Sequence, residues 1–104
     1  MLGRGRFGEV VQSQLDIFAL ADEPLLAEAA AADAAWTHAE REESEELFGD
    51  YQLVVDAIGQ RLYDIRESYA GTLDQATADD YRAAFDRGAL KRFRRYASFL
   101  EAGE

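Results

Sequence analysis

Apolar residues recur three and four positions apart along most of the chain, which is the spacing of one face of an α-helix. The first run covers residues 7–21, and its stripe consists of Phe7, Val10, Val11, Leu15, Phe18 and Ala21. Asp22 then precedes Glu23 and Pro24, an order typical of a cap and the first turn of a second helix. Because the connection is so short, we expect the first helix and the start of the second to lie antiparallel.

The second helix has no proline after its first turn and is rich in Ala, Glu and Leu, so the pattern predicts a long central helix over residues 24–70. Its second half carries a stripe made of Leu47, Tyr51, Val54, Ile58, Leu62, Ile65 and Tyr69. Residues 37–46 are polar on nearly every side. The helix therefore either continues through them in solvent or bends between Thr37 and Asp50, with Gly49 as a second candidate bend.

A third helix is predicted from Ala78 to Glu101, with Thr77 as its N-cap and two aspartates in its first turn. Its apolar line consists of Tyr81, Phe85, Ala89, Phe93, Tyr96 and Leu100. Gly88 lies inside this helix, where it either permits close approach of another helix or lowers helix stability by up to about 1 kcal/mol.

These elements predict an all-α fold of three helices in a single domain, residues 1–104, with residues 1–6 as a flexible basic tail. The middle helix pairs with the first through its first half and with the third through its second half. Each pairing alone is a hairpin with an exposed apolar stripe, so we expect a homodimer that completes four-helix-bundle packing. The alternative is a compact monomeric three-helix bundle with a broken middle helix and a radius of gyration of about 13 Å.

The composition excludes several classes of protein. Lys and Arg total 11 against 21 Asp and Glu, so the net charge is −10 and the chain repels nucleic acid and anionic lipid. There is no cysteine, which excludes a disulfide scaffold and favours a cytoplasmic location. No apolar stretch is long enough to cross a membrane, so we expect neither nucleic acid nor membrane as a partner.

The charge is distributed unevenly. Residues 24–50 hold eight acids and one arginine, whereas residues 81–100 hold six bases and one acid. Either the basic helix folds back over the acidic segment, or it meets the acidic half of a second copy or an acidic partner protein. The residues that we expect to carry this interaction are Arg87, Lys91, Arg94 and Arg95.

His38, Glu42 and Glu45 form the one candidate metal site, because their spacing places an imidazole and two carboxylates on neighbouring helical turns. A carboxylate-rich, ferritin-like metal-binding protein is therefore the alternative function. The Glu-x-x-His pairs of di-iron bundles are absent, and a run of glutamates is also typical of a hydrated helix surface.

Residues 2–10 match the glycine-rich loop of protein kinases at its fixed positions, but the strand lysine and the two catalytic motifs of a kinase are missing. What the motif leaves open is an anion site at the start of the first helix. No serine has an organised base in the pattern, and no other cofactor motif is present. The sequence therefore predicts a non-enzymatic helical interaction or self-assembly module.

Overall fold

The computed structural model describes residues 6–97, and all regular secondary structure in this part of the chain is helical. The all-α prediction is thereby confirmed. In chain order the elements are α1 (Gly8–Ala21), α2 (Glu23–Thr37), the 3₁₀ turn η1 (Arg41–Glu43), α3 (Ser44–Ala70) and α4 (Gln75–Arg92).

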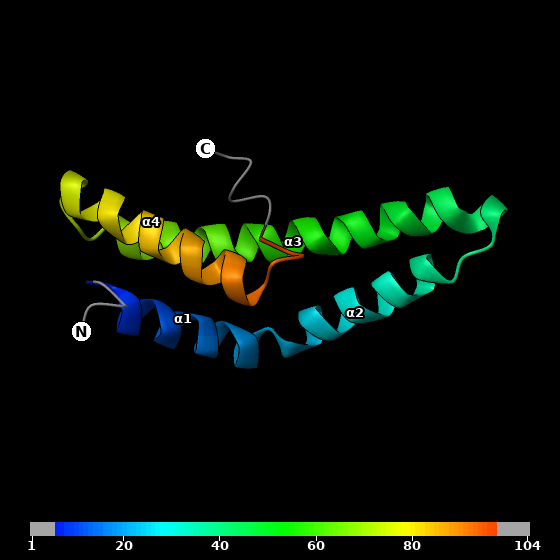
Figure 1. Cartoon of the computed structure of the whole chain (residues 1–104), viewed down its shortest axis with the longest axis horizontal. Helices are drawn as coiled ribbons and strands as arrows, with labels where there is room; N and C mark the ends of the chain where they lie inside the picture. Colours follow the sequence, from blue (N-terminus) through cyan, green and yellow to red (C-terminus); the bar gives the residue numbers. More distant parts are fainter. Residues whose placement is uncertain (1–5, 98–104) are drawn as a thin grey trace.

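The helices form an elongated molecule of 50 × 24 × 22 Å. Figure 1 shows α1 and α2 following one another along one edge, α3 returning antiparallel to both, and α4 lying beside the second half of α3 and next to α1. One half of the molecule therefore contains three helices, α1, α4 and the second half of α3. The other half is a two-helix hairpin of α2 and the first half of α3.

The expected antiparallel arrangement of the first two helices is wrong. Only Asp22 separates α1 from α2, and the helical hydrogen bonding continues across it. Its N–H donates to the carbonyl of Phe18 at 2.8 Å and its own carbonyl accepts from the N–H of Leu26 at 3.1 Å, so the chain bends without reversing. The Asp22 carboxylate does not cap α2. It accepts from Nε and Nη2 of Arg61 at 3.2 and 3.0 Å, which ties the bend to α3.

The continuous helix over residues 24–70 is also wrong, and the alternative of a break between Thr37 and Asp50 is what the structure contains. Residues 38–40 are non-helical and η1 follows them. Residues 37–46 have no apolar stripe, so a break in the helix there exposes no apolar surface to water. The chain can therefore reverse at this segment, which lets α2 pack against α3. Gly49, the second candidate bend, lies within α3.

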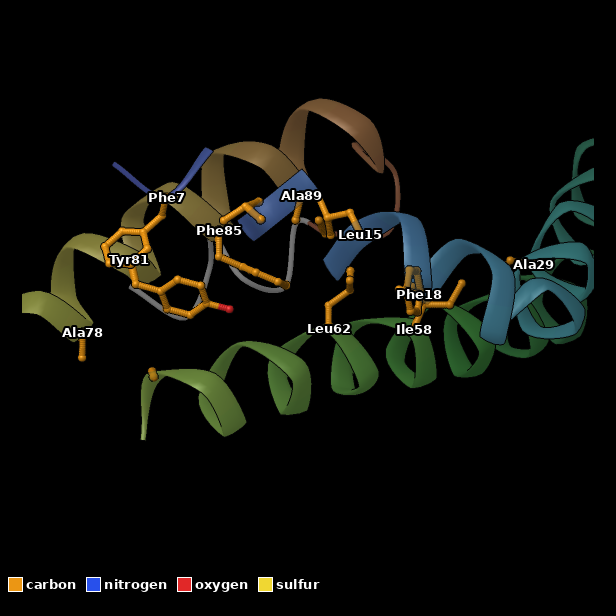
Figure 2. Close-up of a cluster of buried hydrophobic side chains, with 13 residues drawn as sticks. Phe7, Leu15, Phe18, Ala29, Ile58, Leu62, Ala78, Tyr81, Phe85 and Ala89 are labelled. Carbon is orange, nitrogen blue, oxygen red and sulfur yellow. The ribbon is translucent and has the colours of Figure 1, made fainter. Parts of the chain in front are cut away.

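The core lies mainly in the three-helix half and is made from the predicted stripes. Figure 2 shows Leu15 and Phe18 of α1 facing Leu62 and Ile58 of α3. The buried apolar residues are Phe7, Val11, Leu15, Phe18, Ala29, Ile58, Leu62, Ala70, Ala78, Tyr81, Phe85, Ala89 and Ala97. Only Ala29 among them belongs to α2, so the hairpin half contributes little to the described core.

Tyr81 is the largest fully buried side chain, and its ring packs edge to face against Phe7 with the centroids 5.5 Å apart. Its hydroxyl donates to Oε1 of Gln14 at 2.8 Å. Burial raises the pKa of Tyr81 to about 12, because the phenolate would lose its hydration. The buried hydroxyl is therefore satisfied by α1, which fixes the register between α1 and α4.

Both predicted ends of the last helix need correction. It begins at Gln75, and the cap is Asp74: the N–H and the hydroxyl of Thr77 donate to its carboxylate at 2.9 and 3.0 Å. It ends at Arg92, where Phe93 leaves the helix and packs edge to face on Phe18 with the centroids 5.3 Å apart. Residues 98–101 of the predicted helix lie outside the described residues.

Candidate functional site

Two of the four predicted interaction residues, Arg87 and Lys91, line a groove of about 690 Å³ between α1 and α4. We call it the basic groove. The residues lining it are Gly8, Val11, Gln12, Ala84, Arg87, Gly88, Lys91 and Arg92. Among the described residues no acidic side chain lines the groove, although the whole chain carries a net charge of −10.

The cations around the groove differ in how far they are neutralised. Arg92 forms an ion pair with Asp16 of α1 at 2.7 Å, and Arg95 forms one with Asp33 of α2. Within residues 6–97, Arg87 and Lys91 have no carboxylate partner, and both are exposed. Because Arg95 lies against α2, the four predicted residues do not form one surface, and Arg87 and Lys91 are the pair that the fold brings together.

Gly88 explains why α1 and α4 lie so close beside this groove. A Cβ at this position would lie 2.8 Å from Cγ1 of Val11 and 3.4 Å from Cδ1 of Leu15. Of the two roles predicted for Gly88, close helix approach is therefore confirmed. Gly8, at the start of α1, also lines the groove, whereas residues 2–5 of the glycine-rich motif lie outside the described residues.

The hairpin half carries exposed apolar side chains, which we call the hairpin surface: Trp36, Phe48 and Leu53. Trp36 stacks on Tyr51 with the ring centroids 5.8 Å apart and contacts Phe48 at 4.8 Å. Trp36 and Phe48 are 36% and 40% exposed, and Leu53 is 70% exposed. The sequence places Tyr51 on an apolar stripe but does not predict that Trp36 meets Tyr51 and Phe48, because these contacts depend on the chain reversal between α2 and α3.

The three residues of the predicted metal site lie in different elements. His38 is in the connection after α2, Glu42 is in η1 and Glu45 is in the first turn of α3, and all three are exposed. Among residues 6–97, no group of three or more His, Cys, Asp or Glu side chains is placed to hold a metal ion. The metal hypothesis therefore gains no support from the geometry.

An ion network that sequence reasoning missed joins α3 to α4. Arg66 contacts Glu67 and Asp86, each at 2.8 Å, and Arg82 contacts Glu67 at 2.9 Å. Hydrogen bonds from Arg82, and then from Arg66, hold the pKa of Glu67 below its ordinary value. Nothing in the local pattern signals this network, because its partners lie up to 20 residues apart in the chain. It joins two helices side by side and is structural.

Comparisons with protein-family models, with curated proteins and with solved structures find no match to this chain. In the part of the chain that the structure describes, no helix combines the length and the apolar character needed to cross a membrane. The basic groove and the hairpin surface are therefore the two candidate functional surfaces of the chain.

Proposed function

We propose that the chain is a non-enzymatic self-assembly module whose α2–α3 hairpin packs side by side against the hairpin of a second copy. The observation that carries the proposal is the difference between the two halves of the molecule. Three helices enclose the core at one end, whereas within residues 6–97 no third helix lies beside α2 and the first half of α3 (Figure 1). The segment after α4 contacts this half through Arg95, which pairs with Asp33 of α2. A second hairpin would supply the two missing helices of a four-helix bundle.

The exposure of the hairpin surface supports this pairing. A two-helix layer covers only one side of each helix, and large apolar side chains left in water are candidate association sites. Leu53 is 70% exposed and does not pack against the core. It therefore contributes little to the stability of a single chain. Trp36 and Phe48 add aromatic area at the closed end of the hairpin.

The net charge sets the salt dependence of such a dimer. Two copies that each carry −10 repel one another, whereas the apolar contact is insensitive to screening. Added salt should therefore strengthen the side-by-side dimer, since it weakens the repulsion and leaves the attraction intact. A dimer held mainly by ion pairs would respond in the opposite direction.

Leu53→Gln tests the proposal with little risk to folding, because the side chain is already mostly in solvent. Burial of a leucine stabilises by about 1.5–3 kcal/mol, so we expect the dimer to dissociate at least about tenfold more readily. Sedimentation equilibrium at about 0.3 M salt measures this. Leu20→Gln is the matched control, because Leu20 is 80% exposed but lies at the end of α1 outside the hairpin.

The control variant should keep the dissociation constant of the wild type, and circular dichroism should show equal helix content in all three proteins. If Leu53→Gln and Leu20→Gln leave self-association equally unchanged, the hairpin surface is not the contact and the proposal fails.

A further inference from the structure

A second pair of surfaces carries an inference that goes beyond the side-by-side dimer. The first surface is the segment of residues 40–46, which we call the acidic turn. It contains five glutamates and one arginine, and all five glutamates are exposed. In the described part of the chain none of these glutamates belongs to an ion pair. The acidic turn is therefore a concentration of negative charge that the fold does not neutralise.

The second surface is the basic groove, where the imbalance has the opposite sign. Arg66, Arg82, Arg92 and Arg95 each contact at least one carboxylate. The groove cations Arg87 and Lys91 do not contact any carboxylate of residues 6–97. Five of the ten cations within residues 6–97 form an ion pair, and Arg87 and Lys91 are among those that do not, although they lie together beside an open groove.

The two surfaces do not meet within one chain. The acidic turn covers η1 and the first turn of α3, whereas α4 lies beside the second half of that helix (Figure 1). The acidic turn lies at the closed end of the α2–α3 hairpin, whereas the basic groove lies between α1 and α4 in the three-helix half of the molecule (Figure 1). Contact between them requires two molecules.

The spacing of the charges matches. Arg87 and Lys91 are four residues apart on α4, so their side chains lie one helical turn apart on the same face. Glu42 and Glu46 have the same separation across the junction of η1 and α3. Each cation of the groove can therefore face one carboxylate, while Val11 and Ala84 give the groove an apolar floor against which the stems of these side chains can pack.

We propose that the basic groove binds the acidic turn of a second copy, with Arg87 and Lys91 facing Glu42 and Glu46. The two contacting surfaces are different, so the contact is head-to-tail and each molecule keeps one free groove and one free turn. The contact uses none of the hairpin surface, and it can therefore fail while the side-by-side dimer holds, or the reverse. Exposed ion pairs are screened, so it forms at low ionic strength and dissociates as salt is added.

Two charge-reversed variants test this contact in the Leu53→Gln background, which weakens the side-by-side dimer. One is Arg87→Glu/Lys91→Glu and the other is Glu42→Lys/Glu46→Lys. At about 0.01 M salt we expect each variant alone to associate at least about tenfold more weakly than the parent, because like charges then face each other. An equimolar mixture of the two should associate as the parent does, since both contacts become complementary again. Sedimentation velocity measures all three samples.

Glu28→Lys/Asp56→Lys is the matched control, because it makes the same change to the net charge at exposed acids of α2 and α3. Both this control and Glu42→Lys/Glu46→Lys reduce the overall repulsion, so an effect of net charge alone would strengthen association in both. The proposal predicts that only the control keeps or exceeds the parent's association.

The proposal is overturned if single reversals leave low-salt association unchanged, or if the mixture does not recover it. Binding of inorganic phosphate in the groove, detected by chemical-shift changes at Arg87 and Lys91, would assign the groove to small anions. If it occurs in a parent that stays monomeric at low salt, it also overturns the proposal.

Discussion

Gly88 sets the distance between α1 and α4 at the scale of a single methyl group. A Cβ there would lie 2.8 Å from Cγ1 of Val11, closer than two carbon atoms normally approach. Valine is branched at Cβ and has one favoured rotamer in a helix, so it cannot easily turn away. The opposite case is Gly49 in α3, where nothing lies within 4 Å of the same added atom.

We therefore expect the same substitution to have opposite effects at these two positions. Gly88→Ala should lower the free energy of unfolding by about 1–2 kcal/mol, because overpacking outweighs the gain in helix propensity. Gly49→Ala should raise it by up to about 1 kcal/mol, because only the propensity changes. Urea denaturation of both variants measures this, and equal effects of the same sign would contradict the packing at Gly88.

At the same scale, the apolar spacing identifies most of the core in advance. Leu15, Ile58, Tyr81 and Phe85 all lie on predicted stripes and are all fully buried. Spacing does not reveal which residues meet across helices, so the hydrogen bond from Tyr81 to Gln14, 67 residues apart, has no local signal. The helical period predicts which face of a helix is buried, but which side chains contact one another across two helices depends on the tertiary fold.

At the scale of elements, a single residue decides the topology. A connection of one residue suggests a tight reversal, yet Asp22 keeps backbone hydrogen bonds to both sides and the chain only bends. Local sequence could not predict this, because the partner that holds the bend is Arg61, 39 residues further along the chain. The same limit applies to the basic residues of α4, whose placement in a groove depends on α1.

The network between α3 and α4 predicts a pH-dependent contribution to stability. Hydrogen bonds from Arg82 and Arg66 lower the pKa of Glu67 below its ordinary value of 4.5. A depressed carboxyl pKa adds stability above the pKa of the unfolded chain, and this is lost as the pH falls through the lower pKa of the folded state. Glu67→Gln should therefore reduce the free energy of unfolding by about 1 kcal/mol at pH 7 and have little effect near pH 2.

Urea denaturation across this pH range checks the Glu67 prediction, with Glu28→Gln as a control at an exposed carboxylate in the middle of α2 without an ion pair among the described residues. The control should stay within the error of the wild type at every pH. A difference for Glu67→Gln that is the same at pH 7 and pH 2 would mean that packing, and not charge, accounts for it.

At the scale of the whole molecule, a single chain is already elongated. Its radius of gyration is 15.6 Å, whereas a compact chain of this length has about 13 Å. An increased radius therefore does not by itself indicate a dimer, and molecular mass has to decide. The elongation follows from the break after Thr37, which leaves a two-helix half projecting from a three-helix half.

The two proposed contacts give the molecule opposite responses to salt. The hairpin surface should pair more strongly as salt screens the net charge of −10, whereas the contact between groove and acidic turn should weaken. At intermediate ionic strength both contribute, and side-by-side dimers joined head-to-tail would extend into larger assemblies.

Small-angle scattering of the wild-type chain over a range of concentrations at about 0.3 M salt tests self-assembly most directly, since forward intensity gives mass and the low-angle slope gives the radius of gyration. We expect the mass to rise from 11.6 kDa toward twice that value, with a radius well above 15.6 Å. A mass that stays at 11.6 kDa into the high micromolar range, with a radius close to that of the single chain, would contradict the account.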